Sequence, residues 1–307
     1  MYLSIVIVNW NSNDTLRNCV RSILTNKPDF DYEVLIIDNN SSDDSLEGIS
    51  ENNIKIIRND QNLGFSKACN QGIKLSKGKY ILLLNPDTLV MNNSLNKMVY
   101  FLDDNKNVGI LGCKLLNPDG SVQPSCHTFL TLTNVFFEVS QLNRLFPKNK
   151  FFIKTLGFLS NYFSLFTNYK VPTQPLEIDS VMGSCYMIQE EALQKVGLFD
   201  ENFFLYHEEM ELSYRIWQEG YKVMFYPFAS VTHYGKYSTK RVPNFVYYER
   251  CKSILYFFRK HKHSQIRDLK SIMLISLFIN FFSVPFKKDF RSALSYRLKV
   301  FKLIINY

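Results

Sequence analysis

Short apolar runs alternate with longer segments of mixed polarity along the first 115 residues of the chain. The apolar runs predict strands at 3–8, 33–37, 54–58, 80–84 and 108–114. The segments between them predict helices at 15–24, 43–51, 65–75 and 95–103. Because such alternation is typical of parallel strands joined by helices, we expect an α/β fold with a mostly parallel sheet and helices on both faces.

The apolar run Tyr80–Leu84 ends abruptly in Asn85, Pro86 and Asp87. Five apolar residues in a row favour a strand covered on both faces, and Pro86 ends it because proline cannot donate to a sheet ladder. Asp87 would then lie where open α/β sheets bind ligands, and its carboxylate would suit a hard divalent cation that holds a diphosphate. The same three residues also suit a simple turn.

The tripeptide occurs a second time as Asn117, Pro118 and Asp119, here followed by Gly120. The glycine and the extended residues 121–123 favour a plain turn that leads into a hairpin arm. Only the first copy closes the series of strands and helices.

Polar side chains follow the predicted strands; they are Asn9, Asn11, Asp38, Asn39, Asn59, Asn62 and Asp87. Since the loops after parallel strands meet at one edge, these residues predict a rim rich in amides and carboxylates. The loop 9–14 contains no glycine, and the chain has no P-loop motif. The pattern therefore argues against nicotinamide binding and P-loop chemistry.

An acidic segment that contains Glu208, Glu209 and Glu211 begins a helical pattern in the second half of the chain. Carboxylates in a first turn stabilise a helix through its dipole, which is one interpretation. The other is that burial and like-charge repulsion hold one of them as a base near neutral pH. Before this segment we expect a strand at 181–188 and a helix at 190–196.

His233 follows a predicted strand at 221–227 and precedes a glycine. A lone histidine is more often an ordinary surface or core residue than a ligand. If it meets Asp87 in the fold, the two would form an oxygen and imidazole site for Mn²⁺ or Mg²⁺, with a diphosphate filling other positions.

The net charge of +8 is unevenly distributed. Residues 240–307 carry 15 lysines and arginines against 3 acids, whereas residues 1–239 carry 21 against 25. This argues against nucleic-acid binding and indicates that the tail contacts an anionic surface. The six cysteines show no Cys-x-x-Cys spacing, and Met1 leads directly into a predicted strand, so we expect a cytoplasmic protein without a signal peptide.

Two apolar stretches of the tail, 254–258 and 272–286, lie beside lysine and arginine clusters. The second is shorter than the about 20 residues that a spanning helix needs. We expect a helical extension that lies in the membrane interface and is drawn to anionic lipid. The alternative is a tail that packs on the rest of the chain or on another subunit of a homo-oligomer.

The order of these motifs resembles family 2 glycosyltransferases of the GT-A fold, and among them bacterial rhamnosyltransferase-like members that build surface polysaccharides. The motifs are 5–11, 36–43, 62–65 with 70–72, 84–88, and 197–201 with 204–212. The resemblance covers about residues 3–239. We therefore expect a GT-A domain at 1–239, with an insertion at 129–172, and a membrane-associating helical extension at 240–307.

The resemblance implies roles for single residues. The positions that match the nucleotide-sugar site are Asn9, Asn11, Asp38, Asn62, Gly64, Asn70, Asn85 and Asp87. Asp38 matches the acid that contacts the nucleotide base, and the segment that includes Asn62, Gly64 and Asn70 matches the stretch beside ribose and diphosphate.

The resemblance also implies a metal site and a catalytic base. Asp87 matches the last position of the metal-binding Asp-x-Asp motif and His233 an additional ligand, with Asn85 in place of the first acid. Glu209 matches the general base of the usual Glu-Asp pair, one methylene longer here, with Glu208 as the alternative base.

The expected activity is the metal-dependent, inverting transfer of rhamnose or another hexose from a dTDP- or UDP-sugar. The expected acceptor is a growing, lipid-linked surface polysaccharide at the inner face of the plasma membrane. The alternatives are a sugar nucleotidyltransferase, which should carry a glycine-rich phosphate loop, and a non-catalytic relative bound to the membrane.

Overall fold

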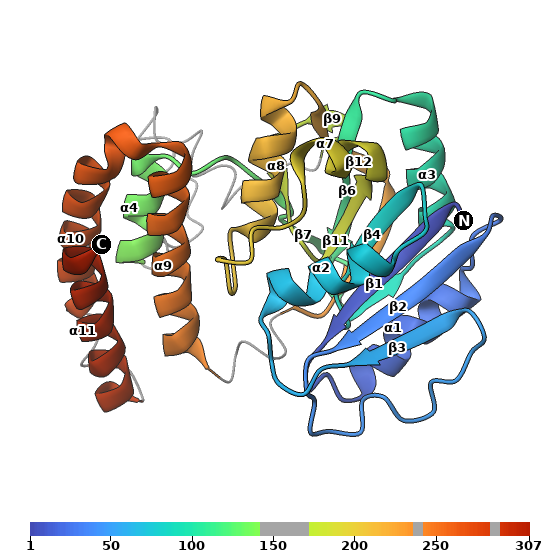
Figure 1. Ribbon diagram of the computed structural model, residues 1–307, viewed down its shortest axis with the longest axis horizontal. Coiled ribbons are helices and arrows are strands. Elements are labelled where there is room, and N and C mark those ends of the chain that lie inside the picture. The colour runs from blue at the N-terminus through green and yellow to red at the C-terminus, as the bar shows by residue number, and fades with distance from the viewer. Residues whose placement is uncertain (142–171, 236–241, 283–288) are drawn as a thin grey trace. The chain divides into compact units, whose positions relative to one another are not determined.

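The computed structural model describes residues 1–141, 172–235, 242–282 and 289–307, and the chain divides into two compact units (Figure 1). The α/β unit comprises residues 1–128, 170–204 and 208–240, and the helical unit comprises 129–169, 205–207 and 241–307. Most of the expected insertion at 129–172 lies outside the described residues.

A mixed sheet forms the α/β unit, with the strand order β3-β2-β1-β4-β11-β6-β12-β5. The strands are β1 (Leu3–Asn9), β2 (Tyr32–Asp38), β3 (Ile54–Arg58), β4 (Tyr80–Leu84), β5 (Thr88–Val90), β6 (Val108–Leu116), β11 (Cys185–Gln189) and β12 (Lys222–His233). Strands β1 to β4 are parallel, β11 is antiparallel to both β4 and β6, and β12 is parallel to β6. The expected mostly parallel sheet is confirmed.

Helices cover both faces of this sheet because the residues of a strand point alternately to its two sides. Leu3 and Ile5 of β1 belong to a buried cluster with residues of α1 (Asp14–Thr25) and α3 (Ser94–Asp104). Val6 belongs to a second cluster with residues of α2 (Phe65–Leu75), α7 (Glu190–Val196) and α8 (Glu208–Gln218).

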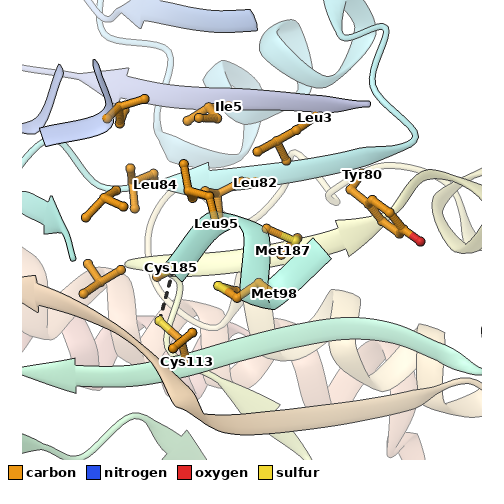
Figure 2. Packing of buried hydrophobic residues seen from close by; sticks show 14 of the residues in the cluster. Leu3, Ile5, Tyr80, Leu82, Leu84, Leu95, Met98, Cys113, Cys185 and Met187 are labelled. Atoms are coloured by element: carbon orange, nitrogen blue, oxygen red, sulfur yellow. Dashed lines mark hydrogen bonds between the residues drawn. The ribbon is translucent and has the colours of Figure 1, made fainter. Parts of the chain in front are cut away.

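Figure 2 shows part of the first cluster, in which the Sγ atoms of Cys113 and Cys185 lie 3.4 Å apart on neighbouring strands. All six cysteines are buried free thiols. They fill the core, as expected for cysteines without close pairing in the sequence.

The helix predicted at 43–51 is wrong, because residues 43–48 form turns. The Asp43 carboxylate accepts hydrogen bonds from the backbone amides of Asn13 and Ser45 and from the Ser45 hydroxyl, and Gly48 has a φ of 73°. Local hydrogen bonds of this kind compete with helix formation.

The strand predicted at 181–188 is interrupted. β10 (Ser180–Val181) pairs with β8 (Cys126–His127), and β11 begins only at Cys185. Between them the Ser184 carbonyl accepts a hydrogen bond from the Asn85 amide at 3.0 Å. The interruption therefore brings the backbone of 183–184 to the end of β4.

The second Asn-Pro-Asp copy forms the predicted turn. The Gly120 amide donates to the Asn117 carbonyl at 2.9 Å, and β7 (Val122–Gln123) pairs with the end of β6. β12 is longer than predicted and continues past Pro227, where its register with β6 is irregular between Tyr226 and Ser230. Irregular pairing of this kind accommodates a proline within a strand.

The helical unit contains α4 (Leu132–Ser140), α9 (Pro243–His261), α10 (Ile266–Phe281) and α11 (Phe290–Asn306). Hydrogen bonds join them: the Tyr247 hydroxyl donates to the Val139 carbonyl at 3.0 Å, and the Asn280 amide donates to the Ser140 carbonyl at 3.2 Å. No helix among the described residues is both long and apolar enough to cross a membrane.

The expectation that residues 254–258 lie in a membrane interface is wrong. Ile254, Leu255, Phe257 and Phe258 are fully buried in the helical unit. These residues form the apolar face of α9 that packs into the core of this unit. The end of the second apolar stretch, at 283–286, lies outside the described residues.

Candidate active site

Asn9 and Asp38 end two neighbouring parallel strands and lie opposite each other in the register. The Asn9 amide nitrogen donates to Asp38 Oδ1 at 2.8 Å and to the hydroxyls of Ser41 and Ser45. Both residues are buried, and Asn9 Oδ1 has no hydrogen-bond partner among the described residues. The pair forms a buried, hydrogen-bonded polar cluster at the carboxyl ends of β1 and β2.

Asn11 lies in the loop that follows β1 and has a left-handed backbone conformation, with a φ of 50°. The side-chain oxygen of Asn11 accepts from the backbone amide of Ser42 at 2.8 Å, and the backbone amide of Asn11 donates to the Ser41 hydroxyl at 2.9 Å. These bonds tie the loop after β1 to the loop after β2. Asparagine suits the position because its short polar side chain tolerates the left-handed region.

Asn39 connects the loop after β2 to the loop between β3 and α2. Its side-chain oxygen accepts from the Asn59 amide group and the Leu63 backbone, and its nitrogen donates to Asn62 Oδ1 and the Gly64 carbonyl. The sequence placed Asn39 on the rim but gave it no role. Its position directly after Asp38 was the only signal.

Gly64 begins α2 at a φ of 86°, and a Cβ atom there would lie 2.7 Å from the Phe204 ring. The neighbouring Phe65 amide donates to the Phe204 carbonyl at 3.1 Å. Only glycine fits, so the loop at 62–65 lies tightly against residue 204.

Asn70 is buried within α2 and uses both ends of its side chain. Its oxygen accepts from the Phe199 amide at 3.0 Å, and its nitrogen donates to the Phe199 carbonyl at 2.9 Å and to Glu201 Oε1 at 3.0 Å. Asn70 thus fastens the 197–201 loop to the helix that follows the Gly64 turn.

Asp87 and His233 meet at the end of the sheet. His233 Nε2 lies 3.4 Å from Asp87 Oδ1, both side chains are buried, and the Tyr234 amide donates to the Asp87 carbonyl at 2.9 Å. The pairing of β12 with β5, which places His233 opposite Thr88, brings them together. His233 was a candidate ligand only if it lay near Asp87, and the structure places the two side chains together.

Gln123 contacts this histidine and orients its ring, a role for which no pattern in the sequence provided a signal. Gln123 Nε2 donates to Asn117 Oδ1 at 3.2 Å, so its Oε1 faces His233 Nδ1, 2.6 Å away. This acceptor favours a proton on Nδ1, which leaves Nε2 as the ring nitrogen that faces Asp87 and could bind a metal. This is how metal-ligating histidines are usually oriented.

The described residues contain no cluster of three or more histidine, cysteine, aspartate or glutamate side chains placed to hold a metal ion. Asp87 and His233 supply one carboxylate and one imidazole, a donor set that suits Mn²⁺. The backbone of Asn85 lies at the same strand end.

Glu208 and Glu209 begin α8. The Glu209 carbonyl accepts from the Tyr186 hydroxyl at 3.0 Å and from the Ser213 hydroxyl at 2.7 Å. Burial, and next the charge of Glu209, raise the pKa of Glu208 well above its usual range. The Oε2 atoms of both glutamates are buried and lack hydrogen-bond partners among the described residues.

Gly183 lies beside the Glu209 side chain, and the residue after it is hydrogen-bonded to the end of β4. A Cβ atom at Gly183 would lie 3.8 Å from the Glu209 side chain, and the next residue, Ser184, accepts the hydrogen bond from Asn85. The backbone at 183–184 therefore runs between the Glu209 side chain and the strand end that leads to Asp87.

Glu211, the third acid of the segment, has a structural role. It is fully buried and binds Arg215 through both carboxylate oxygens at 2.9 and 3.0 Å. Arg215 also donates to the carbonyls of Val196 and Leu198. The interpretation of the segment as helix stabilisation thus fits Glu211, while the other two acids have no comparable cation partner in the described residues.

Comparison with known proteins identifies the family. The family model described as glycosyl transferase family 2 matches residues 4–166, and the chain belongs to this family. The resemblance stated from the motifs is confirmed.

Curated relatives are distant. A low-salt glycan biosynthesis hexosyltransferase of Haloferax volcanii is 28% identical over 225 residues, covering 72% of this chain and 63% of that protein. An N-acetylglucosaminyl-diphospho-decaprenol L-rhamnosyltransferase of Mycobacterium tuberculosis is 25% identical over 235 residues, covering 72% of each.

Solved structures confirm the GT-A fold. GalNAc-T7, crystallised with UDP, GalNAc and Mn²⁺, superposes with a TM-score of 0.56 at 21% identity, over 76% of this chain and 43% of that one. S. aureus TarS superposes with a TM-score of 0.52 at 16% identity, over 92% of this chain and 44% of that one. The chain spans less than half the length of both.

Proposed function

We propose that the protein is an inverting glycosyltransferase that moves a sugar from a nucleotide-diphosphate donor to a growing surface polysaccharide. The observation that carries this proposal is the meeting of Asp87 with His233 at a strand end to which the 183–184 backbone connects Glu209. Family membership supports a transfer reaction, and the site supplies the groups that such a reaction needs.

The nucleotide would bind along the rim formed by the ends of β1 and β2. Asp38, buried beside Asn9, would receive the base, and the loop that contains Asn11 would surround the nucleoside. The orphaned Asn9 Oδ1 is a buried acceptor for which a ligand would provide a donor. The segment with Asn62, Gly64 and Asn70 would lie beside the ribose and the diphosphate, and Asn70 fastens the 197–201 loop to it.

Asp87 and His233 would hold Mn²⁺ or Mg²⁺, with Asn85 at the same edge. When bound, such an ion neutralises the negative charge of a departing nucleoside diphosphate. The donor set fits this ion, and Gln123 keeps the lone pair of His233 Nε2 on the side of Asp87. Since only one carboxylate takes part, we expect the ion to bind weakly without the nucleotide.

Glu209 would take the proton from the acceptor hydroxyl as it attacks the anomeric carbon from the side opposite the leaving group. Such a single displacement inverts the anomeric centre. The raised pKa of Glu208 supports this assignment, because burial favours its protonated form and a protonated carboxyl cannot act as the base. Glu208 would stay protonated beside its neighbour and limit the repulsion between them.

The names of two relatives support a finer proposal for the substrates. The mycobacterial relative is named as an L-rhamnosyltransferase that acts on a diphospho-decaprenol-linked sugar, and the archaeal one as a hexosyltransferase. We therefore propose rhamnose or another hexose as the transferred sugar, dTDP or UDP as the carrier, and a lipid-linked saccharide as the acceptor. The protein would act as a peripheral protein at the inner face of the plasma membrane.

The test is the release of nucleoside diphosphate from a panel of dTDP- and UDP-sugars, with and without Mn²⁺, in the presence of a polyprenyl-diphosphate saccharide. Glu219→Gln is the matched control for Glu209→Gln, because Glu219 is exposed just beyond the end of α8. Metal-stimulated release that survives in the control and is lost in Glu209→Gln supports the proposal. Release of pyrophosphate from a sugar phosphate and a nucleoside triphosphate would instead identify a nucleotidyltransferase.

A further inference from the structure

α10 exposes a row of large apolar side chains to solvent. Ile275, Phe278 and Phe282, the residue that caps the helix, are 56%, 66% and 68% exposed. Their spacing of three and four residues places them on one face of the helix. The opposite face, with Leu269, Met273 and Leu277 buried, already packs into the core of the helical unit. The exposed row is therefore additional to the residues that this unit needs for folding.

α11 carries a second row of the same kind. Leu298, Phe301 and Ile305 are 48%, 46% and 52% exposed and are again spaced by three and four residues. Val300 and Ile304 are fully buried. Together the two rows form what we call the apolar face, which consists of Ile275, Phe278, Phe282, Leu298, Phe301 and Ile305.

Two hydrogen bonds show that the two helices that carry these rows run beside each other. Lys270 Nζ donates to the Ile305 carbonyl at 3.3 Å, and Arg297 Nε donates to Asn280 Oδ1 at 2.9 Å. The start of α10 thus lies by the end of α11, so the two helices are antiparallel. Most residues of the apolar face lie along the two helices between the Lys270–Ile305 and Arg297–Asn280 hydrogen bonds.

The charges beside the apolar face are almost all positive. α10 and α11 contain six lysines and arginines against one aspartate. Arg297 is buried, and the other five lie at or near the surface; they are Arg267, Lys270, Arg291, Lys299 and Lys302. A second copy of this chain docked by a two-fold axis would place these positive charges opposite themselves, which disfavours self-association through this face.

We propose that the apolar face docks the helical unit onto an anionic lipid bilayer. The phenylalanine and aliphatic side chains would enter the boundary between headgroups and acyl chains, while the lysines and arginines would contact lipid phosphates. The proposal deepens the proposed function, on which it rests for the lipid-linked nature of the acceptor. It assigns membrane contact to α10 and α11 and not to the apolar stretch of α9, in which Ile254, Leu255, Phe257 and Phe258 are buried.

The test uses the full chain with vesicles of phosphatidylglycerol and phosphatidylethanolamine, and with vesicles of phosphatidylcholine alone. The first variant is Phe278→Glu with Phe282→Glu; both side chains are mostly exposed, so the substitutions leave the core intact. The matched control is Phe228→Glu, on β12 of the α/β unit, where the side chain is 51% exposed. The parent and the control should sediment with anionic vesicles, and the double variant should bind at least about tenfold more weakly.

A second variant, Lys299→Glu with Lys302→Glu, separates charge from apolar contact. It should bind anionic vesicles about tenfold or more weakly, because each basic residue near the surface contributes roughly a fivefold preference. High salt should weaken parental binding in the same direction. The proposal would be overturned if both double variants bound anionic vesicles as tightly as the parent does. It would also be overturned if the parent did not bind anionic vesicles.

Light scattering and donor turnover complete the design. A parental dimer that Phe278→Glu with Phe282→Glu converts to a monomer would overturn the proposal and identify the face as an interface between copies. Release of nucleoside diphosphate from a soluble donor should be the same in every variant. A parent that binds vesicles but turns over no donor would contradict the proposed function and leave the docking face intact.

Discussion

His233 Nε2 faces Asp87 Oδ1 at 3.4 Å, although the two residues come from strands far apart in the sequence. The antiparallel pairing of β12 with β5 fixes this relationship, and Gln123 fixes the ring that takes part in it. A carboxylate and an oriented imidazole at a ligand-binding sheet edge form the part of the site on which donor binding is expected to depend.

Gln123 should matter for metal dependence although it touches neither nucleotide nor acceptor in our proposal. Gln123→Ala removes the acceptor for His233 Nδ1, and loss of such a supporting contact commonly costs about 10–100-fold in metal affinity or activity. The measurement is the Mn²⁺ concentration that gives half-maximal donor turnover. Gln194→Ala, which removes an exposed amide from α7, should leave this concentration unchanged. An equal response to metal in Gln123→Ala and the parent would contradict the role given to Gln123.

The two neighbouring glutamates should respond differently to the same substitution. Glu208→Gln resembles the protonated carboxyl that burial favours at this position, so we expect activity within a few-fold of the parent. Glu209→Gln removes the base, which typically contributes about 10²–10⁴ in rate. The measurement is kcat for sugar transfer at saturating donor. Reversed effects would make Glu208 the base.

Glu208 should also make folding stability depend on pH. Its pKa is raised in the folded protein, chiefly by burial, so its favourable contribution is complete below the unfolded pKa near 4.5 and is lost as pH rises toward the folded pKa. Glu208→Gln has no charge to bury, so its Tm relative to the parent should increase as pH rises above about 4.5. Differential scanning fluorimetry across pH checks this, and a Tm difference that is constant with pH would contradict it.

Asp103 should make folding stability fall at low pH. It lies near the start of β1 and β4, where it contacts Tyr2 and Tyr80. It accepts hydrogen bonds from Tyr2, Lys79, Tyr80 and Lys106. Partial burial alone would raise the pKa of Asp103, but these bonds, the one from Lys79 first, lower it well below the usual value of 3.8. Its contribution is therefore present above pH 3.8 and is lost as pH falls below that value.

Asp103→Asn should lower the free energy of unfolding at neutral pH by about 1–2 kcal/mol, a modest value because the side chain is partly exposed. Urea unfolding at pH 7 and at low pH measures this difference. The difference between variant and parent should shrink at low pH; if it is the same at both pH values, the network does not act through the charge of Asp103.

Gly72 should tolerate no side chain, because a Cβ atom there would lie 2.3 Å from Val6 Cγ1. Gly72→Ala forces α2 away from β1, and overpacking of this kind usually costs about 1–3 kcal/mol. The second substitution Val6→Ala removes the clashing methyl groups. In urea unfolding the double variant should lose less stability than the two single losses added together; simple additivity would show that the helix relieves the clash elsewhere.

The sequence predicted two strands and one helix with accurate bounds where a regular pattern was bounded by polar or glycine residues. Ile54–Arg58, Tyr80–Leu84 and Phe65–Leu75 were predicted with the bounds that the structure has. It failed at 43–51, where Asp43 and Ser45 form local hydrogen bonds, because a periodic pattern does not reveal where side chains compete with the helix. It failed again at 254–258, since an apolar run beside basic residues does not reveal whether tertiary packing covers it.

The candidate site could be predicted only as separate pieces. The pattern singled out Asp87 after a buried strand and the acidic segment at the start of a helix, and the family resemblance then selected Glu209 within that segment. The approach of His233 to Asp87 depends on the pairing of β12 with β5, and Gln123 reaches His233 only through the hairpin after β6. Contacts between distant strands of this kind are set by the whole sheet. No local pattern could have shown them.

The central claim is a division of labour between Asp87, which serves donor binding, and Glu209, which serves the transfer step. The most direct measurement compares Asp87→Asn with Glu209→Gln by calorimetric titration of UDP or dTDP in Mn²⁺ and by the rate of sugar transfer. We expect Asp87→Asn to lose metal-dependent nucleotide binding, whereas Glu209→Gln should bind nucleotide like the parent and transfer almost no sugar. A Glu209→Gln variant that transfers sugar at the parental rate would contradict the central claim.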